Sequence, residues 1–116
     1  MTIQYKNQGF KQTDTSKATV LTCPNDGTII VKSVYVANND ASTDILVNMN
    51  LVDASDSLTE FEFFRDDVAA KSQVNATPQG LNLEASDAIT VQAATGSSKI
   101  QGVINYALIN RENENG

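Results

Sequence analysis

Two neighbouring runs of β-branched and apolar residues constrain the fold more than any other part of this sequence. They cover residues 28–38 and 44–52, are rich in Ile, Val and Leu, and are separated by the short polar segment 39–43. Such runs favour extended backbone, and a polar connection of about five residues is typical of a hairpin. We therefore expect two adjacent antiparallel strands. In the second run apolar and polar residues alternate, which predicts one buried face and one solvated face.

The rest of the chain is expected to add further short strands around this pair. Turn signals such as residues 24–27 and 78–80 recur at roughly 8- to 12-residue intervals, a spacing typical of an all-β sandwich or barrel. Residues 66–77 fit either one helical turn or extended backbone, and we favour the extended form. The other expected strands cover residues 18–23, 58–65, 81–83, 89–93 and 99–109. The prediction is an all-β fold, a single antiparallel β-sandwich of jelly-roll or Ig-like type.

The length of 116 residues suits one domain with one core. Residues 1–16 are expected to form an extended N-terminal arm or an edge strand, because apolar residues alternate only loosely there. Residues 17–109 form the predicted sandwich domain. Residues 110–116 are expected to be a polar C-terminal tail.

The charge of the chain argues against two classes of partner. A net charge of -6 opposes binding to nucleic acid, whose affinity comes from clustered Lys and Arg, and it opposes binding to anionic membrane surfaces. No apolar run approaches the roughly 20 residues that span a bilayer. The first residues lack the apolar segment of a signal peptide, so we expect synthesis and folding in a cytoplasm.

The sequence offers little catalytic chemistry. Histidine is absent, which removes the commonest general base and metal ligand. Between residues 40 and 67 eight acidic residues face a single Arg65. Carboxylate-pair catalysis needs one buried acid with a raised pKa, whereas these acids fall in turns or on polar strand faces. We therefore predict a protein that is not an enzyme and needs no cofactor.

Calcium is the alternative use of the acidic residues. Asp53, Ser55, Asp56 and Glu60 are close enough in sequence to share an ion, and calcium prefers such oxygen ligands. Their spacing does not match an EF-hand loop, and the central glycine is missing. A charged, solvated loop is the interpretation we favour, so no metal ligand is assigned.

Other residues with chemical potential have simpler interpretations. Tyr5, Phe10, Tyr35 and Tyr106 have rings suited to stacking on sugars, but aromatic residues scattered over separate strands more often belong to a core or an interface. Cys23, the only cysteine, allows no disulfide within the chain and is interpreted as a small apolar filler.

The last expected strand, residues 99–109, is apolar on both faces. Such a strand is either central in the core or has an outer face that meets another subunit. We combine its second face with the apolar residues of the N-terminal arm. The predicted interface residues are Ile3, Tyr5, Phe10, Val103, Ala107 and Ile109.

The order of the turns and strands resembles that of a family of small β-sandwich proteins. The matching segments are a Pro-x-x-Gly turn at 24–27, the strand end Val34-Tyr35-Val36-Ala37-Asn38, the alternating strand 45–51, and the run Leu81-Asn82-Leu83-Glu84-Ala85-Ser86-Asp87-Ala88-Ile89-Thr90-Val91. Together they resemble small structural proteins of tailed bacteriophages, including cyanobacterial phages. The resemblance covers about residues 17–109. It departs at Ser86, where such proteins often carry Gly.

The resemblance implies a virion component with no catalytic residues. It is expected to be a decoration or cement protein on the capsid, or a small neck or tail protein, made in the host cytoplasm and located in the virion. Its expected partners are the phage major capsid protein, or neck or tail proteins, and further copies of itself in a homo-oligomer. The alternative is a carbohydrate- or calcium-binding sandwich for host attachment.

Overall fold

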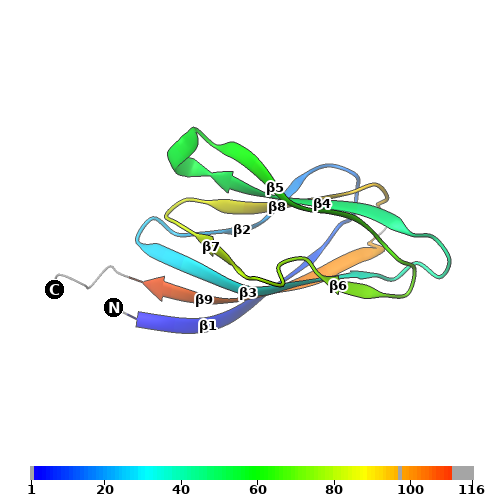
Figure 1. Cartoon of the computed structure of the whole chain (residues 1–116), viewed down its shortest axis with the longest axis horizontal. Helices are drawn as coiled ribbons and strands as arrows, with labels where there is room; N and C mark the ends of the chain where they lie inside the picture. Colours follow the sequence, from blue (N-terminus) through cyan, green and yellow to red (C-terminus); the bar gives the residue numbers. More distant parts are fainter. Residues whose placement is uncertain (1, 97, 111–116) are drawn as a thin grey trace.

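The computed structural model, which describes residues 2–96 and 98–110, consists of two β-sheets packed face to face (Figure 1). A 3-10 turn, η1 (Ala54–Asp56), lies between the fourth and fifth strands. The strands are β1 (Thr2–Lys11), β2 (Ala18–Thr22), β3 (Gly27–Asn38), β4 (Ile45–Asp53), β5 (Thr59–Val68), β6 (Gln73–Asn75), β7 (Leu81–Leu83), β8 (Ala88–Ala93) and β9 (Ile100–Asn110).

The strands divide between two antiparallel sheets. Sheet A has the order β1-β9-β3-β6, with β7 also paired to β3, and sheet B has the order β2-β8-β4-β5. This arrangement confirms the predicted all-β antiparallel sandwich. In the described part of the chain, no helix has the length or apolar character needed to cross a membrane.

The core lies between the inner faces of the two sheets. Alternate residues of the central strands β3, β4, β8 and β9 point inward, as the pleat requires, and these inward residues are almost entirely apolar. Sheet A contributes Ile29, Val31, Val34, Val36 and Ile104, and sheet B contributes Ile45, Val47, Met49, Ile89 and Val91, each at most 1% exposed.

The expected hairpin of residues 28–38 and 44–52 is wrong. β3 pairs with β9, β6 and β7 in sheet A, whereas β4 pairs with β5 and β8 in sheet B. The connection is therefore an arch between the sheets, and the two strands face each other across the core. An arch and a hairpin have the same sequence pattern, two half-buried strands joined by a polar turn. The pattern of polar and apolar residues alone therefore does not distinguish an arch from a hairpin.

Asn38 stabilises this arch from inside. Its side chain is 1% exposed, and Nδ2 donates to the carbonyl oxygens of Thr43 and Val68, both at 2.8 Å. Its Oδ1 accepts from the backbone N–H of Asp40 at 2.9 Å. The amide thus links the end of β3 to the connection and to the end of β5.

The structure also shows the conformation of residues 66–77 and of the N-terminal segment. Residues 66–77 are largely extended, as favoured, with β5 ending at Val68 and β6 following a short turn. β1 pairs with β9 along its whole length, from Thr2 with Asn110 to Lys11 with Gln101, and so lies as the edge strand of sheet A. Residues 111–116 of the predicted tail lie outside the described residues.

Candidate interaction face

The outer face of sheet A is built from rows of side chains that β1, β9 and β3 place side by side. Directly paired residues of antiparallel strands point to the same face, so the register fixes each row. The rows on the outer face are Ile3, Ile109 and Thr28; then Tyr5, Ala107 and Ile30; then the polar row Asn7, Asn105 and Ser33; then Gly9, Val103 and Tyr35. We call Ile3, Tyr5, Ile30, Tyr35, Val103, Ala107 and Ile109 the apolar face.

Large apolar side chains on this face are unusually exposed. Tyr5 is 75% exposed and Ile3 52%, while Ile30, Tyr35 and Val103 are each at least 40% exposed. A single exposed apolar side chain is normal in a monomeric protein, but neighbouring ones on one sheet face mark a contact surface. The geometry therefore identifies this face as the candidate site.

Most of the predicted interface residues meet here. Ile3, Tyr5, Val103 and Ile109 lie on the apolar face, although the sequence separates the first two from the others by about the length of the chain. Ala107 lies there too but is 6% exposed, so it contributes little surface. The structure gives their positions, and their role as interface residues stays a prediction.

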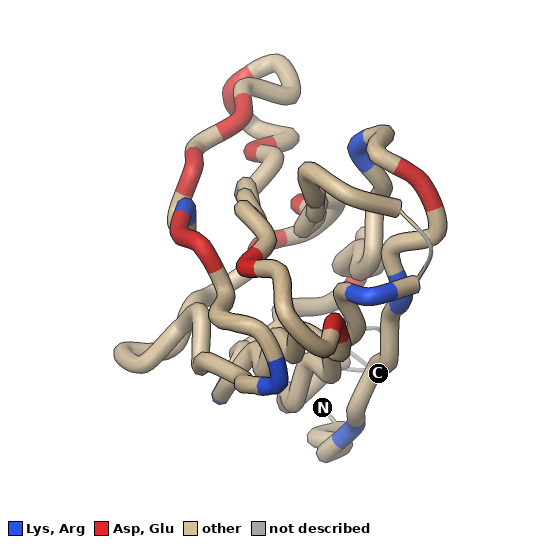
Figure 2. Tube along the Cα trace, turned by 90° about the vertical axis from the view of Figure 1, so that its right-hand side faces the viewer, with Lys and Arg blue, Asp and Glu red and all other residues tan. Residues whose placement is uncertain are grey.

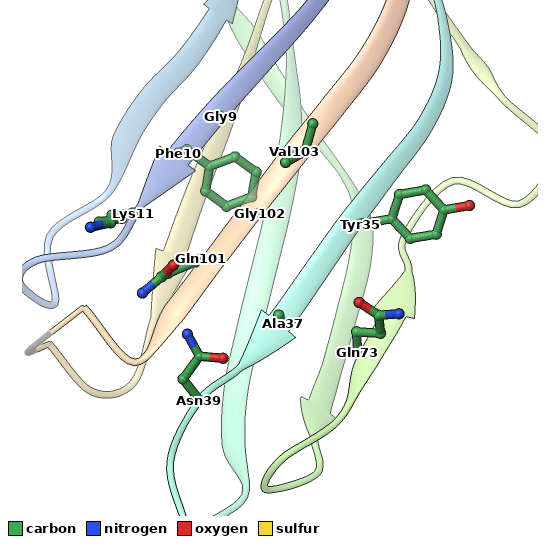
Figure 3. Close-up of a pocket in the computed structure, with 10 residues that line it drawn as sticks. All are labelled: Gly9, Phe10, Lys11, Tyr35, Ala37, Asn39, Gln73, Gln101, Gly102 and Val103. Carbon is green, nitrogen blue, oxygen red and sulfur yellow. The ribbon is translucent and has the colours of Figure 1, made fainter.

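Phe10 differs from the other predicted interface residues. The register puts it opposite Gly102, in the row of the buried Val36, and its side chain packs against the core. The ring lies across β9 at Gly102 (Figure 3), where a Cβ would collide with it. Phe10 therefore supports β9 from the core side of sheet A.

The sequence analysis missed Ile30 and Tyr35. The register of β3 and β9 shifts between Val31 and Ser33, so Lys32 is an extra residue in a β-bulge. Inward positions are odd before the bulge and even after it, which turns both Ile30 and Tyr35 outward. In the run 28–38 the buried apolar residues occupy odd positions up to Val31 and even positions from Val34. This change in the alternation could have indicated the bulge from the sequence.

Lys32 contributes the charge nearest to the apolar face. Its Nζ lies 4.8 Å from the centroid of the Tyr5 ring, although β9 lies between β3, which carries Lys32, and β1, which carries Tyr5. A cation over an aromatic ring is stabilised by the electron-rich face of the ring. This contact orients Tyr5, the most exposed member of the apolar face.

A groove of about 560 Å³ lies at one end of the apolar face (Figure 3). The side chains of Tyr35 and Val103 lie in it, with Lys11 and Gln101 at its border. Among the described residues that line it there is one cation and no acid. The lining residues are Gly9, Phe10, Lys11, Tyr35, Ala37, Asn39, Gln73, Gln101, Gly102 and Val103.

Two of the acidic residues considered for calcium, Asp53 and Glu60, already accept hydrogen bonds from neighbouring side chains or backbone. Asp53 Oδ1 accepts from the N–H of Ser55 at 3.0 Å and from its hydroxyl at 2.6 Å. Glu60 forms an ion pair with Lys17 at 2.9 Å and accepts from Asn50, and these two donors lower the pKa of its carboxyl group. The described residues contain no group of three or more acidic or cysteine side chains suited to a metal ion.

Acids and exposed tyrosines lie in different places. Glu60, Glu62, Asp66 and Asp67 follow the β5 edge of sheet B. Figure 2 shows acidic residues gathered along one stretch of the chain at the left of the view. Tyr5 and Tyr35 lie on sheet A, and Tyr106 is buried at 8% exposure. The combination of aromatic rings and acids expected of a sugar site does not occur on the apolar face. Cys23 is 1% exposed, at the end of β2.

No protein-family model matches the sequence, and no curated protein matches it. A chain from Bacillus endospore appendages, described as disulfide-linked pili, superposes with a TM-score of 0.51 at 12% identity, covering 94% of this chain and 88% of that chain. A chain of the infectious bursal disease virus Gx strain gives 0.44 at 8% identity, covering 96% and 33%. A chain of the cyanophage Pam1 capsid asymmetric unit gives 0.38 at 16% identity, covering 94% and 83%. The pilus chain shares the sandwich fold.

Proposed function

We propose that this chain is a non-enzymatic structural protein of a tailed-phage virion, a decoration or cement protein that binds the capsid shell through the apolar face. The observation that carries the proposal is the set of exposed apolar side chains on the outer face of β1, β9 and β3, which lie on both sides of the polar row Asn7, Asn105 and Ser33. Its binding mechanism is surface complementarity between a rigid sheet and the neighbouring shell subunits.

The rigidity of the face supports this role. β9 is paired on both sides, with β1 along 10 residue pairs and with β3 along 11. A surface on paired strands loses little conformational entropy on binding, so more of the contact energy remains as affinity. Many copies on a symmetric shell would further strengthen attachment, since each contact raises the effective concentration of the next.

The virion as location is inferred from the resemblance of residues 17–109 to small sandwich proteins of tailed phages. The fold is compatible with assembly, because a chain of similar fold belongs to the disulfide-linked pili of Bacillus endospore appendages. A neck or tail accessory protein is the alternative position within the same virion.

The test is co-sedimentation of the purified protein with separated shells, necks and tails of candidate tailed phages. Binding to shells at a fixed ratio is the expected result. Ile30→Asp places a charge on the apolar face and should abolish binding, whereas the matched Asn48→Asp change on the outer face of sheet B should leave it intact. Wild-type protein that binds no virion part, or equal binding by both variants, overturns the proposal.

A further inference from the structure

We propose that the groove at the end of the apolar face receives the tip of the β4–β5 hairpin of a second copy, joining copies head to tail. The tip comprises residues 53–60 and carries the exposed side chain of Leu58. Tyr35 and Val103 belong to both the groove and the apolar face, so this contact overlaps the end of the proposed shell contact that lies away from Ile30.

The hairpin presents Leu58 to solvent in an unfavourable backbone conformation. Its side chain is 64% exposed, and its φ of 64° lies in the left-handed region, as does that of Ser57 at 56°. Residues with a Cβ rarely adopt this region, and an exposed leucine gains nothing from it within one chain. The combination points to a side chain displayed for a contact.

The tip is a defined turn. Leu58 N–H donates to the Asp53 carbonyl at 2.9 Å, and the hydroxyl of Thr59 donates to the carbonyl of Asp56 at 2.6 Å. The Asp53 side chain accepts from Ser55 at the start of η1. These bonds fix the position of Leu58 before any partner is met, which lowers the entropic cost of docking.

The groove offers the matching surface. Tyr35 and Val103 supply apolar contact area in the groove. The tip carries Asp53 and Asp56 close to Leu58 and has no cation within residues 53–60. The described groove lining carries Lys11 and no acid. Leucine thus meets an apolar floor, and acids meet a cation at its border.

The shape of the molecule excludes the tip of the same chain as the occupant of the groove. The chain extends 55 Å along its longest axis. Figure 1 shows the hairpin between β4 and β5 at the upper left and the ends of β1 and β3, which border the groove, farther to the right. The tip therefore cannot reach the groove of its own chain. A contact between two different surfaces repeats from copy to copy and gives an open chain or a closed ring.

The test is sedimentation velocity of the full chain, without shells, over a range of concentrations. Wild-type protein should associate. Leu58→Gly relieves the left-handed backbone, so the variant should melt no lower than wild type, yet its association should weaken by about tenfold or more. Val103→Asp should weaken association similarly. Monomeric wild-type protein, or unchanged association of L58G, overturns the proposal.

Charge reversal tests the pairing itself. Lys11→Glu and Asp56→Lys should each weaken association alone, and an equal mixture should restore it, since the reversed groove then meets the reversed tip. A mixture no stronger than its components overturns the assignment. Shell binding that depends on Leu58 without any self-association would assign the tip to a shell protein and overturn the second copy as occupant.

Discussion

The outer faces of the two sheets differ although both sheets cover the same core. On sheet B most outward side chains of β4 and β5 are polar, and several are bonded to one another: Asn50 donates to Glu60 at 3.2 Å, and Arg65 pairs with Glu62 at 2.8 Å. The outward Leu46 and Val52 are only half-buried. On sheet A the outward rows contain Ile3, Tyr5, Ile30, Tyr35 and Val103, all substantially exposed.

This difference distinguishes the features that the sandwich needs in order to fold from the apolar outer face, which it does not need. Inward apolar residues and antiparallel pairing are common to both sheets, and sheet B shows that a polar outer face is compatible with them. The apolar outer face of sheet A is therefore not needed to build the sandwich. Exposed apolar area costs solubility, so its presence calls for a partner surface.

Making sheet A resemble sheet B should have the largest effect. The variant Tyr5→Gln, Ile30→Asn, Val103→Gln should weaken binding to the shell by about 1,000-fold, or about 4 kcal/mol, because three apolar contacts are lost. Thermal unfolding should change little, since these side chains are already exposed. Binding is measured by co-sedimentation and unfolding by circular dichroism.

The control for this variant is an equally large change on sheet B. Replacing Asn48, Asn50 and Gln92 by Ser should leave shell binding within about twofold of wild type. If the sheet B variant loses binding and the sheet A variant keeps it, the two faces have been assigned in the wrong order.

The junction between the sheets should give the next largest effect. Asn38→Ala removes three hydrogen bonds from a buried site and leaves the carbonyl groups of Thr43 and Val68 without this donor. The free energy of unfolding should fall by about 3 kcal/mol. Asn39→Ala, at an exposed neighbouring side chain, is the control and should be nearly neutral in urea unfolding. Equal losses in the two variants would show that the buried amide does not stabilise the arch.

The sequence predicts the fold class because alternation and turn spacing are local signals. β8 and β4 alternate regularly, and their inner faces are confirmed. Strand pairing is not local, and the arch after Asn38 was read as a hairpin because both have a polar connection. The distinction depends on one buried amide whose partner, Val68, lies 30 positions away.

The candidate site was predictable in part for a similar reason. Ile3 and Ile109 were identified from the apolar faces of terminal strands, and pairing of β1 with β9 brings them together. Ile30 and Tyr35 needed the β-bulge at Lys32, which breaks the rule that alternate residues share a face. Leu58 was not predicted as a contact residue because leucine rarely adopts a left-handed backbone, and nothing in the sequence indicates that it does so here.

Two glycines on paired strands sharpen the comparison within sheet A. A Cβ at Gly102 would collide with the Phe10 ring and with the Tyr35 carbonyl oxygen, which is backbone and cannot easily move. Gly102→Ala should therefore lower the free energy of unfolding by about 2 kcal/mol. At Gly9 the nearest atom to a Cβ is 3.8 Å away, so Gly9→Ala should be neutral or slightly stabilising in the same urea titration. A neutral Gly102→Ala would mean that Phe10 is not held against β9.

The smallest effect concerns the paired charges of sheet B. Hydrogen bonds from Lys17 and Asn50 lower the pKa of Glu60 below its ordinary value of 4.5. A carboxyl group with a lower pKa in the folded state stabilises that state above its unfolded pKa, and the stabilisation is lost as pH falls through the lowered value. Lys17→Met removes the donor that lowers the pKa of Glu60 most, so this variant should have a slightly lower melting temperature than wild type at pH 7.

At a pH below the lowered pKa of Glu60 the melting temperatures of Lys17→Met and wild type should converge, because a protonated Glu60 no longer pairs with Lys17. The pKa of Asp40 is also lowered, by N–H groups of Ser42 and Thr43, but this contribution is the same in both proteins and cancels in the comparison. Added salt should shrink the difference at pH 7, since the pair is exposed to solvent. A difference that is equal at both pH values would show that Lys17 acts by packing its aliphatic stem on sheet B, and its charge would then play no part in keeping that face polar and self-contained.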